Sequence, residues 1–163
     1  LRQAGPEAAA IDLSALVREM LPLVRRELQD ARVEVDLDLA EGLPLVDGLR
    51  VQLGQIVVNL LVNACEALAG VEGDRRVAIS TAERDGRVEL VVSDNGPGLA
   101  AEVAGRLFEP FVTTKAEGLG VGLAICRSIA ERHGGRLSGD TPPGGGFRMT
   151  LALPPARPAE PRP

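Results

Sequence analysis

Aromatic side chains are scarce in this chain, which contains three Phe and neither Trp nor Tyr. Proteins that bind single-stranded nucleic acid stack successive bases on aromatic rings, so this mode of binding is not expected here. The net charge of −5 also differs from the basic balance typical of proteins that bind nucleic acids or anionic membranes. We therefore expect neither a nucleic-acid partner nor a membrane partner for this chain.

Cysteines are few as well, and the two present, Cys65 and Cys126, lie far apart within apolar helical patterns. We interpret them as small buried hydrophobic residues in a reducing compartment, rather than as a disulfide or reactive thiols. No apolar run approaches membrane-spanning length, and no signal peptide opens the sequence. We therefore expect a soluble, cytoplasmic protein and, because the first residue is not Met, a fragment of a longer one.

The remaining composition is that of an ordinary globular domain, with 163 residues of which 45% are apolar and 25% are charged. The core must be built from Leu, Val, Ile and Ala. We expect residues 1–10 to be a linker, residues 11–154 to form one domain, and the Pro-rich residues 155–163 to be disordered.

Hydrophobic periodicity predicts three long helices and five strands. The helices are expected at residues 13–30, capped by Asp12 or Ser14 and irregular at Pro22, at 49–69, and from the second glycine cluster to about 132. The strands are expected at residues 33–39, 76–83, 87–93, 136–139 and 147–153. Asp85-Gly86 predicts a hairpin, so we expect a two-layer α/β sandwich in which one mixed, mainly antiparallel sheet is covered by about three helices.

A polar stripe runs along the otherwise apolar helix expected at residues 49–69. Its members, on one narrow face, are Gln52, Gln55, Asn59, Asn63 and Glu66. A buried unpaired amide costs about 1–3 kcal/mol, so this face must meet water, a partner or a ligand. Asn59 and Asn63 lie one turn apart, and neutral amide oxygens can ligate Mg²⁺. An ordinary solvated helix face is the alternative.

Two glycine-rich segments follow. In the first, Asp94 ends a strand and precedes Gly96 and Gly98, so its carboxylate can accept a hydrogen bond from an exocyclic amine while a flat ring approaches closely. A simple tight turn explains the same pattern.

The second glycine segment contains Gly118, Gly120, Gly122 and Leu123, and opens the third helix, where free N–H groups suit phosphate. It fits neither the dinucleotide fingerprint nor the P-loop. Lys115 is the only lysine among 18 Lys and Arg residues, and its compact ammonium suits a terminal phosphate. We expect Phe108 and Phe111 to anchor the loop between the glycine segments.

In this order, the motifs resemble those of the ATP-binding catalytic domain of bacterial sensor histidine kinases, in the wider group with gyrase, the Hsp90 chaperones and the MutL proteins. The matching segments are residues 55–68 (N box), 94–98 (first glycine box), 107–115 (F box), 118–122 (second glycine box) and 144–147 (last box). The F and second glycine boxes look most like those of nitrogen-, dicarboxylate- and oxygen-responsive kinases.

The resemblance implies Mg²⁺ and ATP as cofactors, and gives each motif a role. Asn63 would ligate Mg²⁺ with Asn59 assisting, and Asp94 would take the adenine amino group within a pocket shaped by Gly96 and Gly98. Lys115 and the backbone from Gly118 to Leu123 would hold the phosphates. Asn59 and Lys115 are thus the expected catalytic residues. The resemblance gives Glu66 and the last box no assigned role.

The resemblance also implies a reaction. Hydrolases and anti-sigma serine kinases of this group carry a basic Glu where this chain has Asn59, which takes no proton at neutral pH. Asn59 therefore favours transfer to histidine on a separate helical domain, with a response regulator downstream. We interpret His133 as a capping or surface residue. The alternatives are a stand-alone ATPase, a serine kinase of the anti-sigma type, or an inactive nucleotide-binding scaffold.

Overall fold

The computed structural model describes residues 8–109 and 122–158. Its elements, in chain order, are β1 (Ala9–Ile11), α1 (Leu13–Met20), the 3-10 helix η1 (Leu21–Val24), α2 (Arg25–Asp30), β2 (Glu34–Leu39), β3 (Val46–Gly48), α3 (Arg50–Leu68), β4 (Arg76–Arg84), β5 (Arg87–Asp94), α4 (Ala101–Ala104), α5 (Gly122–Arg132), β6 (Arg136–Asp140) and β7 (Phe147–Leu153).

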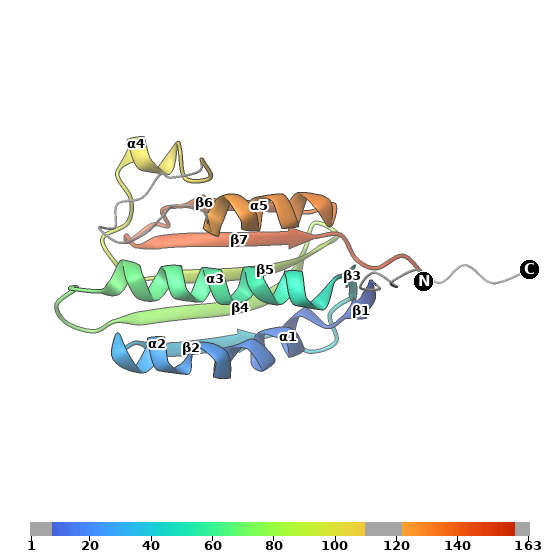
Figure 1. Cartoon of the computed structure of the whole chain (residues 1–163), viewed down its shortest axis with the longest axis horizontal. Helices are drawn as coiled ribbons and strands as arrows, with labels where there is room; N and C mark the ends of the chain where they lie inside the picture. Colours follow the sequence, from blue (N-terminus) through green and yellow to red (C-terminus); the bar gives the residue numbers. More distant parts are fainter. Residues whose placement is uncertain (1–7, 110–121, 159–163) are drawn as a thin grey trace, which may run out of the picture.

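Five strands form one mixed sheet in the order β2-β4-β5-β7-β6. The pair β2–β4 is parallel, whereas the other pairs of this sheet are antiparallel. The helices α1, α3 and α5 lie side by side across one face of the sheet (Figure 1). The predicted two-layer sandwich with a mixed, mainly antiparallel sheet is therefore confirmed.

The central element of the helical layer is α3, whose apolar residues cover the sheet. Its fully buried leucines, such as Leu53 and Leu61, each contribute about 1.5–3 kcal/mol of hydrophobic stabilisation. Within the described part of the chain, α3 is the one helix long and apolar enough to cross a membrane, with a mean hydropathy of 1.4. The sequence predicted a long helix here, at residues 49–69, but no apolar run of membrane-spanning length. Packing against the sheet accounts for this apolar character.

The first predicted helix is divided into three segments. Asp12 caps α1 by accepting a hydrogen bond from the Ala15 N–H at 3.2 Å. Pro22 lies at the start of η1, where its missing N–H has no helical partner to lose. The irregularity predicted at Pro22 is therefore confirmed as a 3-10 turn between α1 and α2.

Ser14 does not cap α1 but joins a buried polar network beneath it. Its Oγ donates to the Ala40 carbonyl at 2.7 Å and lies 2.7 Å from Thr81 Oγ1, which accepts the Ala40 N–H at 2.9 Å. Each hydroxyl has one proton, so the Thr81 hydroxyl must donate to Ser14. The network links α1, β4 and the end of β2.

Three short elements were not predicted from the sequence. Ala9 and Ala10, which the sequence placed in the linker, belong to β1, and β1 pairs antiparallel with β3. The third, α4, lies within the glycine-rich segment that follows β5. Three or four residues carry too little periodicity to reveal such elements, and tertiary contacts determine them.

Two predicted turns are confirmed. Asp85 and Gly86 both adopt positive φ angles, of 52° and 73°, between strands paired as far as Arg84 and Arg87. Gly134 also has a positive φ angle, of 73°, and ends α5 while the Gly135 N–H bonds the Ala130 carbonyl.

Candidate functional site

The C-terminal half of α3, the end of β5 and the start of α5 lie at the same end of the domain (Figure 1). The predicted polar stripe of α3 faces away from the core. Asn59 and Asn63 are half-buried, whereas Gln55 and Glu66 are exposed. Gln52 is half-buried as well but lies near the start of α3, whereas Asn59 and Asn63 lie one turn apart toward its C-terminal end.

Asn59 has a defined contact with α5. Its Nδ2 donates to the Sγ of Cys126 at 3.2 Å. A Cβ at Gly122, in the first turn of α5, would stand 3.9 Å from the same nitrogen. The structure therefore brings together Asn59 and Gly122, which the sequence predicted as site residues from segments far apart in the chain.

Asp94 is half-buried at the end of β5, and its Oδ1 accepts the Gly96 N–H at 2.9 Å. The next residue, Asn95, holds the end of the strand in place. Its Oδ1 accepts the Arg76 N–H at 2.7 Å, and its Nδ2 donates to the Asp74 carbonyl at 2.8 Å. These bonds fix where the strand ends, and hence where the Asp94 carboxylate lies.

The two glycines after Asp94 are required by close packing. A Cβ at Gly96 would lie 3.0 Å from Asp94 Oδ1 and 3.2 Å from the Ala67 carbonyl oxygen of α3. Gly98 has a φ angle of +75°, and a Cβ there would lie 3.0 Å from the Gly146 carbonyl oxygen. Larger side chains would therefore press on the carboxylate or on the neighbouring backbone.

Gly146 is a functional candidate to which the sequence assigned no role. A Cβ on Gly146 would overlap the backbone carbonyl of Asp94, and its φ angle of +80° also disfavours other residues. The turn between β6 and β7 thus packs directly on the end of β5. Three successive glycines before β7 were the only sequence signal, and their purpose depends on a contact between distant segments.

Several predicted site residues lie outside the described ranges, namely Lys115, Gly118 and Gly120, together with Phe111. Leu123 is half-buried and packs against the hydrophobic core. Phe108 also packs against the core, and the Arg127 guanidinium of α5 lies 5.3 Å from its ring centroid. Phe108 therefore joins the segment after β5 to α5.

Both cysteines are free and buried, as the sequence predicted. Burial, and then the charges of Glu27 and Glu66, raise the pKa of Cys65 to about 11. Burial also raises the pKa of Cys126, although the hydrogen bond from Asn59 opposes this effect. Neither thiol is therefore ionised at neutral pH, and neither has the thiolate character of a nucleophile.

The donor set at this end suits a metal bound mainly by a ligand's phosphates. In residues 8–109 and 122–158, no group of three or more His, Cys, Asp or Glu side chains is placed to hold a metal ion. Mg²⁺ commonly takes one or two protein oxygens, several waters and substrate phosphates. The neutral amides of Asn59 and Asn63 fit such a partial site.

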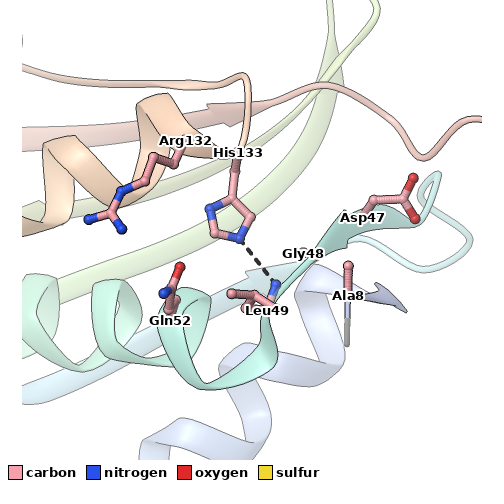
Figure 2. Close-up of a pocket in the computed structure, with 7 residues that line it drawn as sticks. All are labelled: Ala8, Asp47, Gly48, Leu49, Gln52, Arg132 and His133. Carbon is pink, nitrogen blue, oxygen red and sulfur yellow. Dashed lines mark hydrogen bonds between the residues drawn. The ribbon is translucent and has the colours of Figure 1, made fainter. Parts of the chain in front are cut away.

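A separate pocket of about 370 Å³ lies at the opposite end of α3 (Figure 2). Its lining residues are Ala8, Asp47, Gly48, Leu49, Gln52, Arg132 and His133. None of the predicted ATP- or Mg²⁺-binding residues lines it. His133 Nε2 accepts the Leu49 N–H at 3.1 Å, so the proton is on Nδ1, which donates to the Ile129 carbonyl at 2.7 Å. His133 is thus a capping residue, as predicted.

Comparison with known proteins agrees with this architecture. The chain is 38% identical over 157 residues to the sensor histidine kinase TmoS of Ectopseudomonas mendocina, covering 94% of this chain and 16% of TmoS. It is 40% identical over 158 residues to the C4-dicarboxylate transport sensor protein DctS of Rhodobacter capsulatus, covering 94% of this chain and 24% of DctS. The chain therefore spans less than a quarter of either relative.

Two solved structures share the fold. The catalytic domain of histidine kinase ThkA has a TM-score of 0.80 and 27% identity, over 91% of this chain and 96% of that domain. Full-length ShkA in complex with AMPPNP has a TM-score of 0.79 and 28% identity, over 98% of this chain and 33% of ShkA. The fold is therefore that of a histidine kinase catalytic domain.

The match to a family model is direct. Residues 48–157, well over half of the chain, match the model of the histidine kinase-, DNA gyrase B- and HSP90-like ATPases. The chain belongs to this family. The matched range contains both amides of α3, Asp94 and all the glycine segments.

Proposed function

We propose that this chain binds Mg·ATP and donates the γ-phosphoryl group to a histidine on a separate helical domain, in two-component signal transduction. The observation that supports this most strongly is the convergence of the α3 amides, the Asp94 carboxylate and the surrounding glycines at one end of the sheet. Family membership and the likeness to ShkA, solved with an ATP analogue, point to the same ligand.

Each part of the ligand has a partner in this proposal. Asp94 accepts the adenine amino group, and the absence of side chains at Gly96 and Gly98 leaves room for the flat base. Asn63 ligates Mg²⁺ with Asn59 assisting, and the bound ion neutralises charge on the β- and γ-phosphate oxygens. Lys115 and the backbone N–H groups at the start of α5 bind the phosphates.

The acceptor follows from two residues. An amide at Asn59 takes no proton at neutral pH, so it does not activate water or a serine hydroxyl as a carboxylate would. His133 has both ring nitrogens engaged by backbone groups at the far end of α3, away from the proposed ATP site. The acceptor histidine therefore lies on another helical domain, and a cytoplasmic response regulator receives the phosphoryl group next.

The experiment that tests this proposal has two steps. Calorimetric titration of the chain with ADP and AMPPNP, with and without Mg²⁺, should show saturable binding that Mg²⁺ strengthens. Labelled ATP should then phosphorylate an added histidine-bearing helical hairpin, while the chain alone should hydrolyse little ATP. Rapid turnover without the hairpin would favour the stand-alone ATPase instead. Binding without transfer to the hairpin would favour an inactive nucleotide-binding scaffold, and no nucleotide binding would contradict the proposal.

A further inference from the structure

The Asn59 amide is held on one side by α5. Its Nδ2 lies 3.2 Å from the Sγ of Cys126, whose side chain is fully buried. Gly122, one turn earlier on α5, also faces this nitrogen, because a Cβ at that position would stand 3.9 Å from it. The nitrogen edge of the amide thus faces α5, and the planar group directs its oxygen edge away from Cys126.

This orientation matters because the two edges of a carboxamide are similar in shape and opposite in chemistry. The oxygen can ligate a cation, whereas the NH₂ group presents positive hydrogens to it. A rotation of the amide by half a turn would therefore replace a ligand with a repulsive group. In this structure the sulfur of a buried thiol accepts the Nδ2–H, and an S–H group is only a weak donor to the amide oxygen in the reversed orientation.

We propose that Cys126 is a positioning residue, which accepts the Asn59 Nδ2–H and thereby directs the Asn59 oxygen toward the Mg²⁺–phosphate group. The inference rests on the proposed role of Asn59 in binding Mg·ATP. It extends that role to a residue of α5 that does not itself touch the ligand. Loss of an orienting contact behind a metal ligand typically lowers metal affinity by about 10–100-fold.

The chain offers variants that separate orientation from packing. Cys126→Val fills a similar volume without an acceptor for the amide N–H, whereas Cys126→Ser keeps an acceptor. Cys65→Val is the matched control, because Cys65 is also a free, buried cysteine, on the same helix as Asn59. Asn59→Ala removes the amide itself.

The experiment measures the affinity for ADP by calorimetry over a series of Mg²⁺ concentrations, on the 163-residue chain and these four variants. Cys126→Val should raise the Mg²⁺ concentration for half-maximal effect by about tenfold, with Mg²⁺-free affinity within about twofold of the parent. Cys126→Ser should restore part of this loss, and Cys65→Val should match the parent. Thermal unfolding of each variant checks that the fold is retained.

Each way in which the inference could be wrong gives a different result in these titrations. If Asn59→Ala alters the Mg²⁺ response and Cys126→Val does not, the positioning role is wrong and the role of Asn59 stands. If neither variant alters it, the role of Asn59 is wrong and the inference fails with it. An equal loss of affinity with and without Mg²⁺ in Cys126→Val would show a packing role only. A Cys126 effect without an Asn59 effect would also overturn the inference.

Discussion

Polar groups at the two ends of α3 differ in their hydrogen bonds and in their surroundings. At the N-terminal end, the Leu49 N–H donates to His133 (Figure 2). His133 in turn donates to the Ile129 carbonyl of α5. Toward the C-terminal end, Asn59 and Asn63 are half-buried on the polar face of α3. Hydrogen bonds through His133 connect α3 to α5 at the first end, and the second end carries the residues of the proposed ATP site.

Two side-chain contacts together fix the position of α3 relative to α5. His133, just after the end of α5, contacts the start of α3. Cys126, about one turn after the start of α5, contacts Asn59 of α3. Buried apolar residues of both helices, such as Ile56 and Ile129, belong to the same hydrophobic core. The amides therefore hold a fixed position relative to the start of α5, where phosphate binding is proposed.

The largest effect should come from Gly146→Ala, beside the end of β5. The added Cβ overlaps the Asp94 carbonyl and the φ angle is +80°, so we expect the free energy of unfolding to fall by about 3 kcal/mol. Displacement of Asp94 should also weaken ADP binding by about a hundredfold. Urea unfolding and calorimetry measure the two quantities.

The control for this variant is Gly144→Ala, because Gly144 also has a positive φ angle, of +96°, but a Cβ there meets nothing within 4 Å. It should show the backbone strain alone, with ADP affinity close to that of the parent. Equal losses in the two variants would show that strain, and not the contact with Asp94, makes Gly146 necessary.

Asp94→Asn should have the next largest effect. The substitution replaces one acceptor oxygen of the carboxylate with an NH₂ donor, which cannot accept from the adenine amino group or from the Gly96 N–H. ADP affinity should therefore fall by about 30–100-fold, or about 2–3 kcal/mol. Asp140→Asn is the control, since Asp140 also lies at a strand end but pairs with Arg148 at 2.6 Å. Unchanged affinity in Asp94→Asn would remove Asp94 from the proposed adenine pocket.

The same contrast separates what the sequence could predict from what it could not. The long helix α3, the hairpin at Asp85-Gly86 and the end of α5 at Gly134 carry periodicity or turn chemistry within a few residues. The amides of α3 could be chosen because polar groups interrupt an apolar pattern. Local signals of this kind are readable from one sequence.

Contacts between distant segments were not readable in this way. The bond from Leu49 to His133, the thiol partner of Asn59 and the packing of Gly146 on Asp94 each join residues more than fifty positions apart. No local pattern reports which residue lies opposite. Short strands such as β1 depend on the same kind of contact, since β1 exists only through its pairing with β3.

His133→Ala should weaken the connection between α5 and the N-terminal end of α3. It removes two hydrogen bonds and leaves the Leu49 N–H without its imidazole partner, so the free energy of unfolding should fall by about 2 kcal/mol. ADP affinity should stay close to that of the parent, because the change lies at the other end of α3. Arg132→Ala, at the exposed neighbour of His133, is the control and should leave urea unfolding nearly unchanged. A loss of ADP affinity in His133→Ala as large as its loss of stability would show that the two ends of α3 are coupled.

Asn63→Ala should have the smallest effect of these changes. It removes one amide oxygen from the proposed metal site, so the affinity for Mg·ADP should fall by about tenfold, or about 1.4 kcal/mol, to the Mg²⁺-free value. Binding measured in EDTA should be unaltered, because the adenine pocket around Asp94 does not change. Gln55→Ala, on the exposed part of the same stripe, should retain the full response to Mg²⁺. If Asn63→Ala also retains the full response to Mg²⁺, Asn63 does not ligate the metal, and the Mg²⁺ site lies elsewhere.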